Sequence, residues 1–247
     1  MTNADTGTNA DTGTARHLAL FADRGLLERT STADRVAGIL RTRIAEGYFA
    51  PGDRLAEETI TSALGVSRNT LREAFRLLTH ERLLDHRLNQ GVFVRQLTVQ
   101  DIRDLYRVRT IIECAAAGAA TDTGPALDPL RAAIADGEDA LHRQHWQDLG
   151  TANLRFHQRL VALAGSPRLD EIMGGLLAEL RLAFHVMADP DTFYRPYLPR
   201  KREILTRLDT DDPAGAERLL RAYLDDAQHQ LVDACSSTPA GRNRQNS

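Results

Sequence analysis

Between residues 31 and 95, the apolar positions recur first at helical spacing and then in short runs. The first helical pattern follows a polar cap sequence at Ser31–Asp34 and stops at Gly47. A second helix is predicted around 57–64 and a third from about 68 to 81.

The connections between these segments predict their arrangement. The sequence Ala63–Ser67 reads as a tight turn whose serine caps the third helix. Residues 83–95 form two short stretches around Asn89–Gly91, as in a β-hairpin. Three helices followed by a hairpin predict a winged helix-turn-helix.

Beyond residue 96 the apolar positions recur with a period of 3.6 residues throughout, and no segment has the pattern of a strand. Helix breaks are expected at Gly124–Pro125, Gly165 and Asp212–Pro213, and Pro196 and Pro199 are expected to interrupt a helix. Apolar residues of the first helix share one face: Ile102, Leu105, Val108, Ile112 and Ala115. The fold class predicted is mainly α, with the winged helix-turn-helix followed by an all-α antiparallel bundle of six or seven helices.

The pattern also predicts the domain limits. A direct repeat, TNADTG, opens a polar segment that lacks the residues to bury a core. The expected parts are a disordered or weakly ordered arm (1–30), a DNA-binding domain (31–95), a linker (96–100), a helical effector-binding and dimerisation domain (101–235) and a disordered tail (236–247).

Charge differs between the two predicted domains. Residues 31–95 hold 10 Arg against 8 acidic residues, whereas residues 96–235 hold 16 Arg plus Lys against 22 acidic residues. A mildly basic module followed by an acidic one fits a DNA reader joined to a regulatory domain.

The composition narrows the class of protein further. The two cysteines, Cys114 and Cys235, lie far apart and outside any CxxC pair, so we expect reduced thiols in a cytoplasmic protein. The sequence shows no apolar run of about 18–20 residues, so no membrane span is expected. No HExxH motif, paired carboxylates or nucleophile–base arrangement points to an enzyme, and no catalytic residue is assigned.

The third predicted helix has the pattern of a recognition helix. Its inward positions are apolar, namely Leu71, Ala74, Phe75 and Leu78. Arg68, Arg72 and Arg76 recur every four residues on the other face, with Asn69 beside them. Arg binds guanine edges and Asn binds adenine in the major groove, although an ordinary charged helix face would look alike.

Three stretches in this order resemble the GntR family of bacterial regulators: GYFAPGDRL at 47–55, LGVSRNTLREA at 64–74 and GVFV at 91–94. The resemblance implies that double-stranded operator DNA is contacted by Ser67, Arg68, Asn69 and Arg72, with Gly91 at a wing tip in the minor groove. One position departs from the family, because many members have a base-reading arginine on the second helix where this chain has Glu58.

The helical half resembles the ligand domain of the FadR-type branch of that family. This likeness rests on Arg109 and Glu113, on the helix from Asn153 to His157 and on the helix that follows Asp212–Pro213. It implies one effector pocket where these helices converge. The residues assigned to it are Arg109, Asn153, His157, Lys201 and Tyr223.

Many FadR-type members hold a divalent metal with one Asp and three His. At those positions this chain has Asn153, His157, Lys201 and Tyr223, and a protonated amine does not ligate a metal. We therefore expect no metal and no cofactor, with Lys201, the only lysine, as the positive anchor for an anionic effector such as an organic acid.

Plainer interpretations of the same residues remain open. His157 and Tyr223 suit an ordinary core, and Arg109 with Glu113 suits a structural i,i+4 ion pair. Lys201 suits a solvated position, since a shift of the helix by one residue would place Arg200 or Arg202 in the pocket.

The function predicted is a homodimeric transcriptional regulator whose operator affinity a small anionic metabolite controls. One alternative is a helical metal-dependent enzyme fused to a DNA-binding domain, and another is a DNA-binding protein without sensing. The sequence does not identify the effector or the target genes, and it does not decide between repression and activation.

Overall fold

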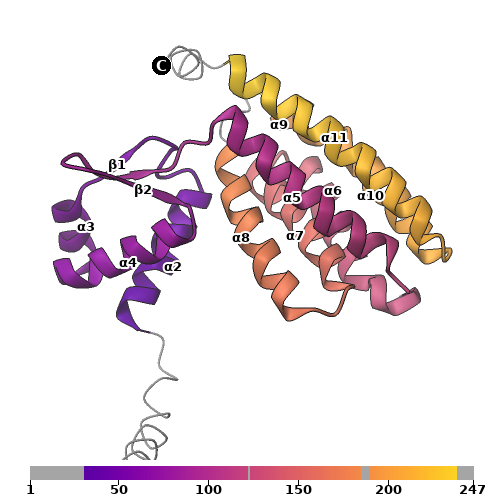
Figure 1. Cartoon of the computed structure of the whole chain (residues 1–247), viewed down its shortest axis with the longest axis horizontal. Coiled ribbons are helices and arrows are strands. Elements are labelled where there is room, and N and C mark those ends of the chain that lie inside the picture. The colour runs from indigo at the N-terminus through magenta and orange to yellow at the C-terminus, as the bar shows by residue number, and fades with distance from the viewer. Residues whose placement is uncertain (1–30, 122, 185–189, 238–247) are drawn as a thin grey trace, which may run out of the picture.

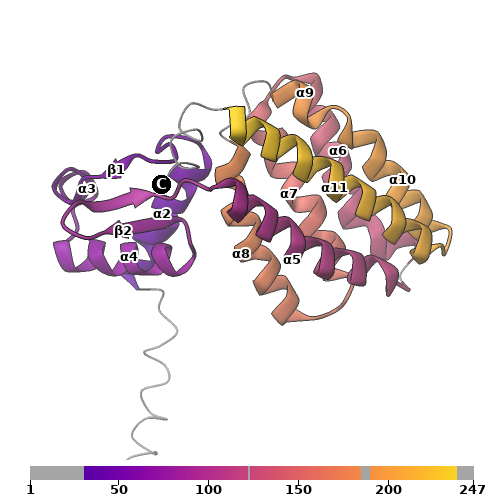
Figure 2. The same ribbon diagram turned by 45° about the horizontal axis from the view of Figure 1, so that its top comes forward.

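The computed structural model describes residues 31–121, 123–184 and 190–237. These residues form two lobes, one built on a small sheet and one entirely helical (Figures 1 and 2). The arm expected at 1–30 and most of the tail expected at 236–247 lie outside the described residues.

The first lobe holds three helices, α2 (Thr32–Ala45), α3 (Glu57–Leu64) and α4 (Arg68–His80). Ser31 and Asp34 form a capping box at the start of α2, as its cap sequence predicts. Gly65 ends α3 in the left-handed conformation, at φ 63°, and Ser67 caps α4. The predicted helix-turn-helix is confirmed.

The sheet of this lobe has three antiparallel strands in the order β1–β3–β2: β1 (Arg54–Leu55), β2 (Leu84–Arg87) and β3 (Gly91–Val94). The hairpin of β2 and β3 matches the predicted wing. Strand β1 was not predicted. Two residues carry no periodicity, and only pairing with β3 makes this segment a strand.

The second lobe is the predicted helical bundle. Its helices are α5 (Val99–Gly118), α6 (Asp128–His142), α7 (Trp146–Ala162), α8 (Pro167–Ala183), α9 (Pro190–Tyr194), α10 (Tyr197–Asp209) and α11 (Pro213–Ser237), with a 3-10 turn, η2, at Gly124–Leu127. Helix α5 packs along α11, and α6 packs along α7 (Figures 1 and 2). Among the described helices, none combines the length and the apolarity that a bilayer span requires.

Several expected limits are corrected. Helix α5 begins at Val99, inside the linker expected at 96–100, and α11 runs to Ser237, inside the expected tail. Pro199 does not interrupt a helix, because it lies in the first turn of α10, where a missing N–H costs no helix hydrogen bond.

The buried face of α5 also differs from the predicted one. Ala115 is exposed, whereas Arg109 and Glu113 are buried. The prediction counted apolar residues alone, so it did not detect that an ion pair occupies part of the interior face.

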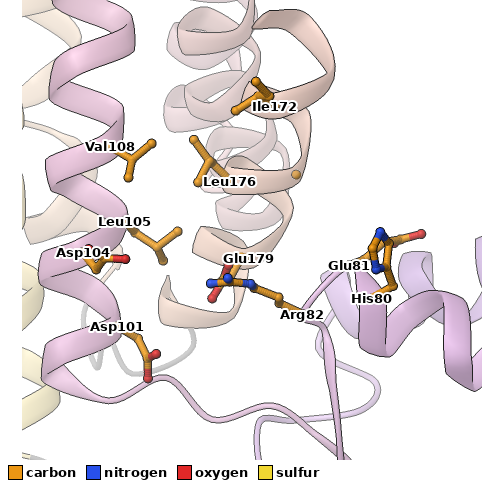
Figure 3. Close-up of a pocket in the computed structure, with 11 residues that line it drawn as sticks. His80, Glu81, Arg82, Asp101, Asp104, Leu105, Val108, Ile172, Leu176 and Glu179 are labelled. Carbon is orange, nitrogen blue, oxygen red and sulfur yellow. The ribbon is translucent and has the colours of Figure 1, made fainter. Parts of the chain in front are cut away.

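Polar contacts join the two lobes. Arg181 of α8 donates its Nε–H to the carbonyl of Ala45, at the end of α2, over 3.2 Å. Arg95, between β3 and α5, binds Asp101 at 2.7 Å and the buried Glu179 of α8 at 3.1 Å. A cavity of about 330 Å³ lies at this junction, and Figure 3 shows Arg82 beside Glu179 there, next to the end of α4.

Candidate functional site

Helix α4 presents the polar face that the sequence predicts. Leu71, Ala74, Phe75 and Leu78 are all buried. Arg68, Asn69, Arg72 and Arg76 are exposed. Ser67 is used locally, because its Oγ accepts the N–H of Thr70 at 3.1 Å and so caps the helix.

Two of the arginines on α4 have carboxylate partners. Glu57 of α3 holds Arg72, with 3.2 Å from Nε and 3.1 Å from Nη2 to its oxygens, and Arg76 pairs with Glu73. Within the described residues, Arg68 and Asn69 have no such partner. Arg72 must therefore leave Glu57 before it can bind a base, and sequence patterns did not reveal this competitor because Glu57 lies on another helix.

Gly91 is the first residue of β3 and pairs with Arg87, so it closes the hairpin below its tip. Its φ of 109° is the left-handed region that favours glycine. The tip itself is formed by residues 88–90, with Leu88 79% exposed.

The helical lobe encloses a second polar group, which we call the buried polar cluster. Its members are the only charged or polar side chains that α5, α7, α10 and α11 bury within the described residues, together with one tyrosine: Arg109, Glu113, Asn153, His157, Lys201 and Tyr223. Four helices thus bring together all five predicted effector residues, with Glu113 in addition.

Hydrogen bonds connect the members of this cluster in a chain. Glu113 accepts from Arg109 Nε at 2.7 Å and binds His157 Nδ1 at 2.6 Å. The other nitrogen of His157 lies 3.2 Å from the Tyr223 hydroxyl. Asn153 Oδ1 accepts from both Tyr223, at 3.1 Å, and Lys201 Nζ, at 2.6 Å.

Burial shifts the pKa values of the cluster. Burial, helped by the nearby Arg109, lowers the pKa of Lys201 to about 7 although Glu113 opposes the shift. Burial likewise lowers the pKa of His157 to about 4 and raises that of Tyr223 well above 10.0. Burial raises the pKa of Glu113, but Arg109 and His157 together lower it by more than burial raises it. The pKa therefore lies below its ordinary value, and this carboxylate stays ionised.

The cluster has more positive than negative charge when Lys201 is protonated. Arg109 and Lys201 are cations, Glu113 is the one carboxylate, and His157 is neutral near pH 7. Arg109 Nη2 is buried and finds no hydrogen-bond partner in the described part of the chain. A buried donor without a partner is costly, so this side of the cluster suits an anionic acceptor.

The same residues do not suit a metal ion. Lys201 donates to Asn153, both nitrogens of His157 are hydrogen-bonded, and Tyr223 keeps its proton at neutral pH. Among the described residues, no three His, Cys, Asp or Glu side chains lie close enough together to share an ion. The donor set disagrees with the Asp and three His of metal-holding FadR-type proteins.

The structure decides between the two interpretations of Lys201. Lys201 is 3% exposed as a whole residue, whereas the side chains of Arg200 and Arg202 are 27% and 59% exposed. The solvated interpretation is therefore wrong, and the register that places Lys201 inside is correct. Sequence reasoning missed that Glu113 bridges Arg109 and His157, since only the i,i+4 pair was visible.

Comparison with known protein families covers both lobes. Residues 32–94 match the bacterial regulatory proteins of the gntR family, and residues 104–226 match the FCD domain. A crystal structure of a transcriptional regulator GntR from Rhodococcus sp. RHA1 is 44% identical and covers 83% of this chain and 99% of its own, with a TM-score of 0.78.

Two curated relatives agree with this match. The HTH-type transcriptional repressor RspR of Escherichia coli (strain K12) is 26% identical over 199 residues, which are 78% of this chain and 86% of that protein. The HTH-type transcriptional regulator YdhC of Bacillus subtilis (strain 168) is 29% identical over 137 residues, 54% of this chain and 61% of that protein. These names are those of transcriptional regulators, which supports the predicted regulator and not the enzyme alternative.

Proposed function

Because the chain belongs to the GntR family of transcriptional regulators and carries an FCD domain, we propose that a small organic anion bound at the buried polar cluster controls its affinity for DNA. The observation that carries the proposal is that Arg109 Nη2 has no hydrogen-bond partner in the described part of the chain, in a buried cluster where the Arg109 charge also acts on the buried Lys201. Two cations face a single internal carboxylate, and a second carboxylate, from the effector, would balance them.

Each polar neighbour has a part in this proposal. Lys201 and Arg109 bind the carboxylate of the effector, and Tyr223 donates a hydrogen bond to it. Neutral His157 gives its one N–H to Glu113 and lines the site through its ring, which packs beside Tyr223. The anion competes with Asn153 for the Lys201 ammonium, now 2.6 Å from its oxygen. The effector is bound without a metal, because the donor set fits an anion and not a cation.

A ligand screen tests this proposal. Small mono- and dicarboxylates are expected to raise the melting temperature of the full-length protein, and their uncharged amides are not. Lys201→Met is expected to abolish both the stabilisation and the release of DNA that the active acid causes. The matched control is Arg202→Met, which removes a neighbouring cation from the exposed side of α10. An unchanged response in Lys201→Met, or one equivalent of zinc or nickel in purified protein, contradicts the proposal.

We propose that Ser67, Arg68, Asn69, Arg72 and Gly91 contact the operator. The four residues at the start of α4 are exposed and Gly91 is partly exposed beside the wing tip, which supports this, since a recognition helix reads base edges with its N-terminal residues. Arg72→Ala is expected to weaken operator binding by about 1–3 kcal/mol and to relax specificity at one base pair per half-site. Wild-type binding by both Arg68→Ala and Arg72→Ala would refute this interface.

We propose further that the regulator works in the cytoplasm as a homodimer on a palindromic operator. One recognition helix reads only a few base pairs, so two symmetric half-sites are needed for useful specificity. The name of the related RspR supports repression as the mode of action. Light scattering at micromolar concentration tests the dimer, and a monomer that binds a single half-site specifically contradicts it.

A further inference from the structure

The outer face of the small sheet carries a pair of arginines that no predicted contact includes. Strand pairing sets Arg54 opposite Phe93 and Arg87 opposite Gly91. Because side chains alternate along a strand, these four positions share one face, together with Asp85, which lies opposite Phe93 on β2. The opposite face carries the buried residues Leu55, Leu84, Val92 and Val94, with His86 as its exposed member.

The side chain of Arg54 extends toward the tip of the wing. Its Cα lies opposite Phe93, but its guanidinium lies at Gly91, two residues nearer the tip. A Cβ placed on Gly91 would stand 3.3 Å from Arg54 Nε and 3.6 Å from Nη2. The missing side chain of Gly91 therefore leaves room for a guanidinium to lie over the start of β3.

Arg87 reaches the same face from the other side. Its guanidinium carbon lies 4.2 Å from the centroid of the Phe93 ring, a cation–π distance. The aromatic ring orients the side chain without neutralising it. One guanidinium group thus lies at Gly91, which closes the hairpin, and the other lies over Phe93, two residues further along β3.

Neither of these charges is compensated in the described part of the chain. Four other arginines of the first lobe have carboxylate partners, whereas Arg68 at the start of α4 has none among the described residues: Arg41 binds Glu81, Arg43 binds Glu46, Arg72 binds Glu57 and Arg76 binds Glu73. Arg54 and Arg87 have no ion pair or hydrogen bond to any described residue. A positively charged surface that the protein leaves unpaired suits an external anion.

We propose that Arg54 and Arg87 bind DNA backbone phosphates that border the minor groove beside the wing. The fork of an arginine matches phosphate oxygens, and each phosphate contact releases bound counterions. This inference rests on the proposed placement of the wing on DNA. It adds a sequence-independent contact to the base readout assigned to α4.

The test measures how binding depends on salt. The probe is a duplex selected by the wild-type protein from a randomised library, followed by fluorescence anisotropy over a range of KCl concentrations. Arg54→Ala is expected to raise Kd roughly tenfold at about 150 mM salt and to lower the slope of log Kd against log salt by about one. Arg87→Ala is expected to act in the same direction, and equally on unrelated duplexes.

Arg218→Ala is the matched control. Arg218 is an exposed arginine near the start of α11, and Figure 1 shows that this end of α11 points away from the first lobe. The substitution changes the net charge equally, so it reports the effect of overall charge alone. Circular dichroism and the melting temperature establish that each variant is folded.

The outcomes separate this inference from the proposed interface. If Arg72→Ala weakens binding while Arg54→Ala behaves like Arg218→Ala, the phosphate contact is refuted and the α4 interface stands. If Arg68→Ala and Arg72→Ala both bind like wild type as well, the proposed interface itself fails. A loss of affinity in Arg54→Ala with an unchanged salt slope likewise overturns the inference, because it indicates a structural effect.

Discussion

Lys201 is a buried cation whose protonation depends on the residues around it. Its ammonium lies 2.6 Å from Asn153 Oδ1, and Arg109 and Glu113 act on it with opposite signs. Its pKa of about 7 lies below the ordinary value of 10.5 because burial disfavours the charged form. The other groups of the cluster keep one protonation state between pH 6 and 9, since the pKa of His157 is about 4 and that of Tyr223 is well above 10.0.

We therefore predict that binding of an organic anion weakens as the pH rises above about 7. Below this pH the lysine is charged in the folded protein, and above it the anchor is neutral, so Kd rises by at most about tenfold per pH unit. The unfolded chain binds more protons than the folded one between pH 7 and 10.5, so without effector Lys201 makes folding more favourable as the pH rises. Calorimetric titration at several pH values measures the first effect.

Lys201→Met supplies the comparison for this prediction. Any anion affinity that this variant retains is expected to be independent of pH over the same range. A wild-type Kd that stays constant from pH 6 to 9 would show that the charge of Lys201 has no part in effector binding.

At the scale of single elements, the turn between α3 and α4 depends on one glycine. Gly65 has φ 63°, and its N–H bonds to the carbonyl of Thr61. A Cβ at Gly65 would meet nothing within 4 Å, so a substitution there costs conformational energy alone. This turn sets the angle at which α4 leaves α3.

We predict that Gly65→Ala lowers the free energy of unfolding by about 1 kcal/mol, because alanine is disfavoured in the left-handed region. Gly65→Asn is expected to lower the free energy of unfolding by less than Gly65→Ala does, since asparagine adopts the left-handed conformation more readily than alanine. Urea denaturation measures both values. Gly38→Ala, inside α2, is the control. It is expected to raise the free energy of unfolding by about 0.5–1 kcal/mol, because alanine favours a helix more than glycine does. Equal effects of alanine at the two positions would contradict the assigned conformation.

At the scale of the whole molecule, the two lobes are coupled by buried charge. Glu179 of α8 is 4% exposed, and burial raises its pKa although Arg95 and Arg82 oppose the shift. Arg95 binds this carboxylate and also Asp101, at the start of α5. Helix α8 packs on α5 and α7, which carry four members of the buried polar cluster, so it connects that cluster with the DNA-binding lobe.

We predict that Arg95→Ala destabilises the protein by about 3 kcal/mol, because it leaves a buried carboxylate without its partner. Adding Glu179→Gln is expected to restore part of this loss, since it removes the uncompensated charge. Denaturant unfolding of both single variants and the double variant measures the coupling. Arg107→Ala is the control, because that arginine is 69% exposed and lies 3.8 Å from Asp104, and it is expected to change stability by less than about 1 kcal/mol. Strictly additive effects at 95 and 179 would refute the coupling.

The sequence by itself determined the long helices, the wing hairpin and their order. The capping box at Ser31, the cap at Ser67 and the Pro167 and Pro213 helix starts are encoded within a few residues. Helical periodicity likewise needs only neighbours along the chain. Local signals of this kind predicted the winged helix-turn-helix, the helical bundle and the exposed face of α4.

The tertiary structure alone decided which side chains meet. Glu113 and His157 are separated by 44 positions and Arg72 and Glu57 by 15, so no periodic pattern relates them. The same limit explains why β1 was missed and why Ala115 was placed on the wrong face of α5. A strand of two residues forms only by hydrogen bonding to a neighbouring strand. Charged residues are assigned to the surface from sequence unless the side chains that bury them are known. Packing of α10 against α6 and α11 turned Lys201 inward, and only that placement makes the charge of one lysine relevant to function.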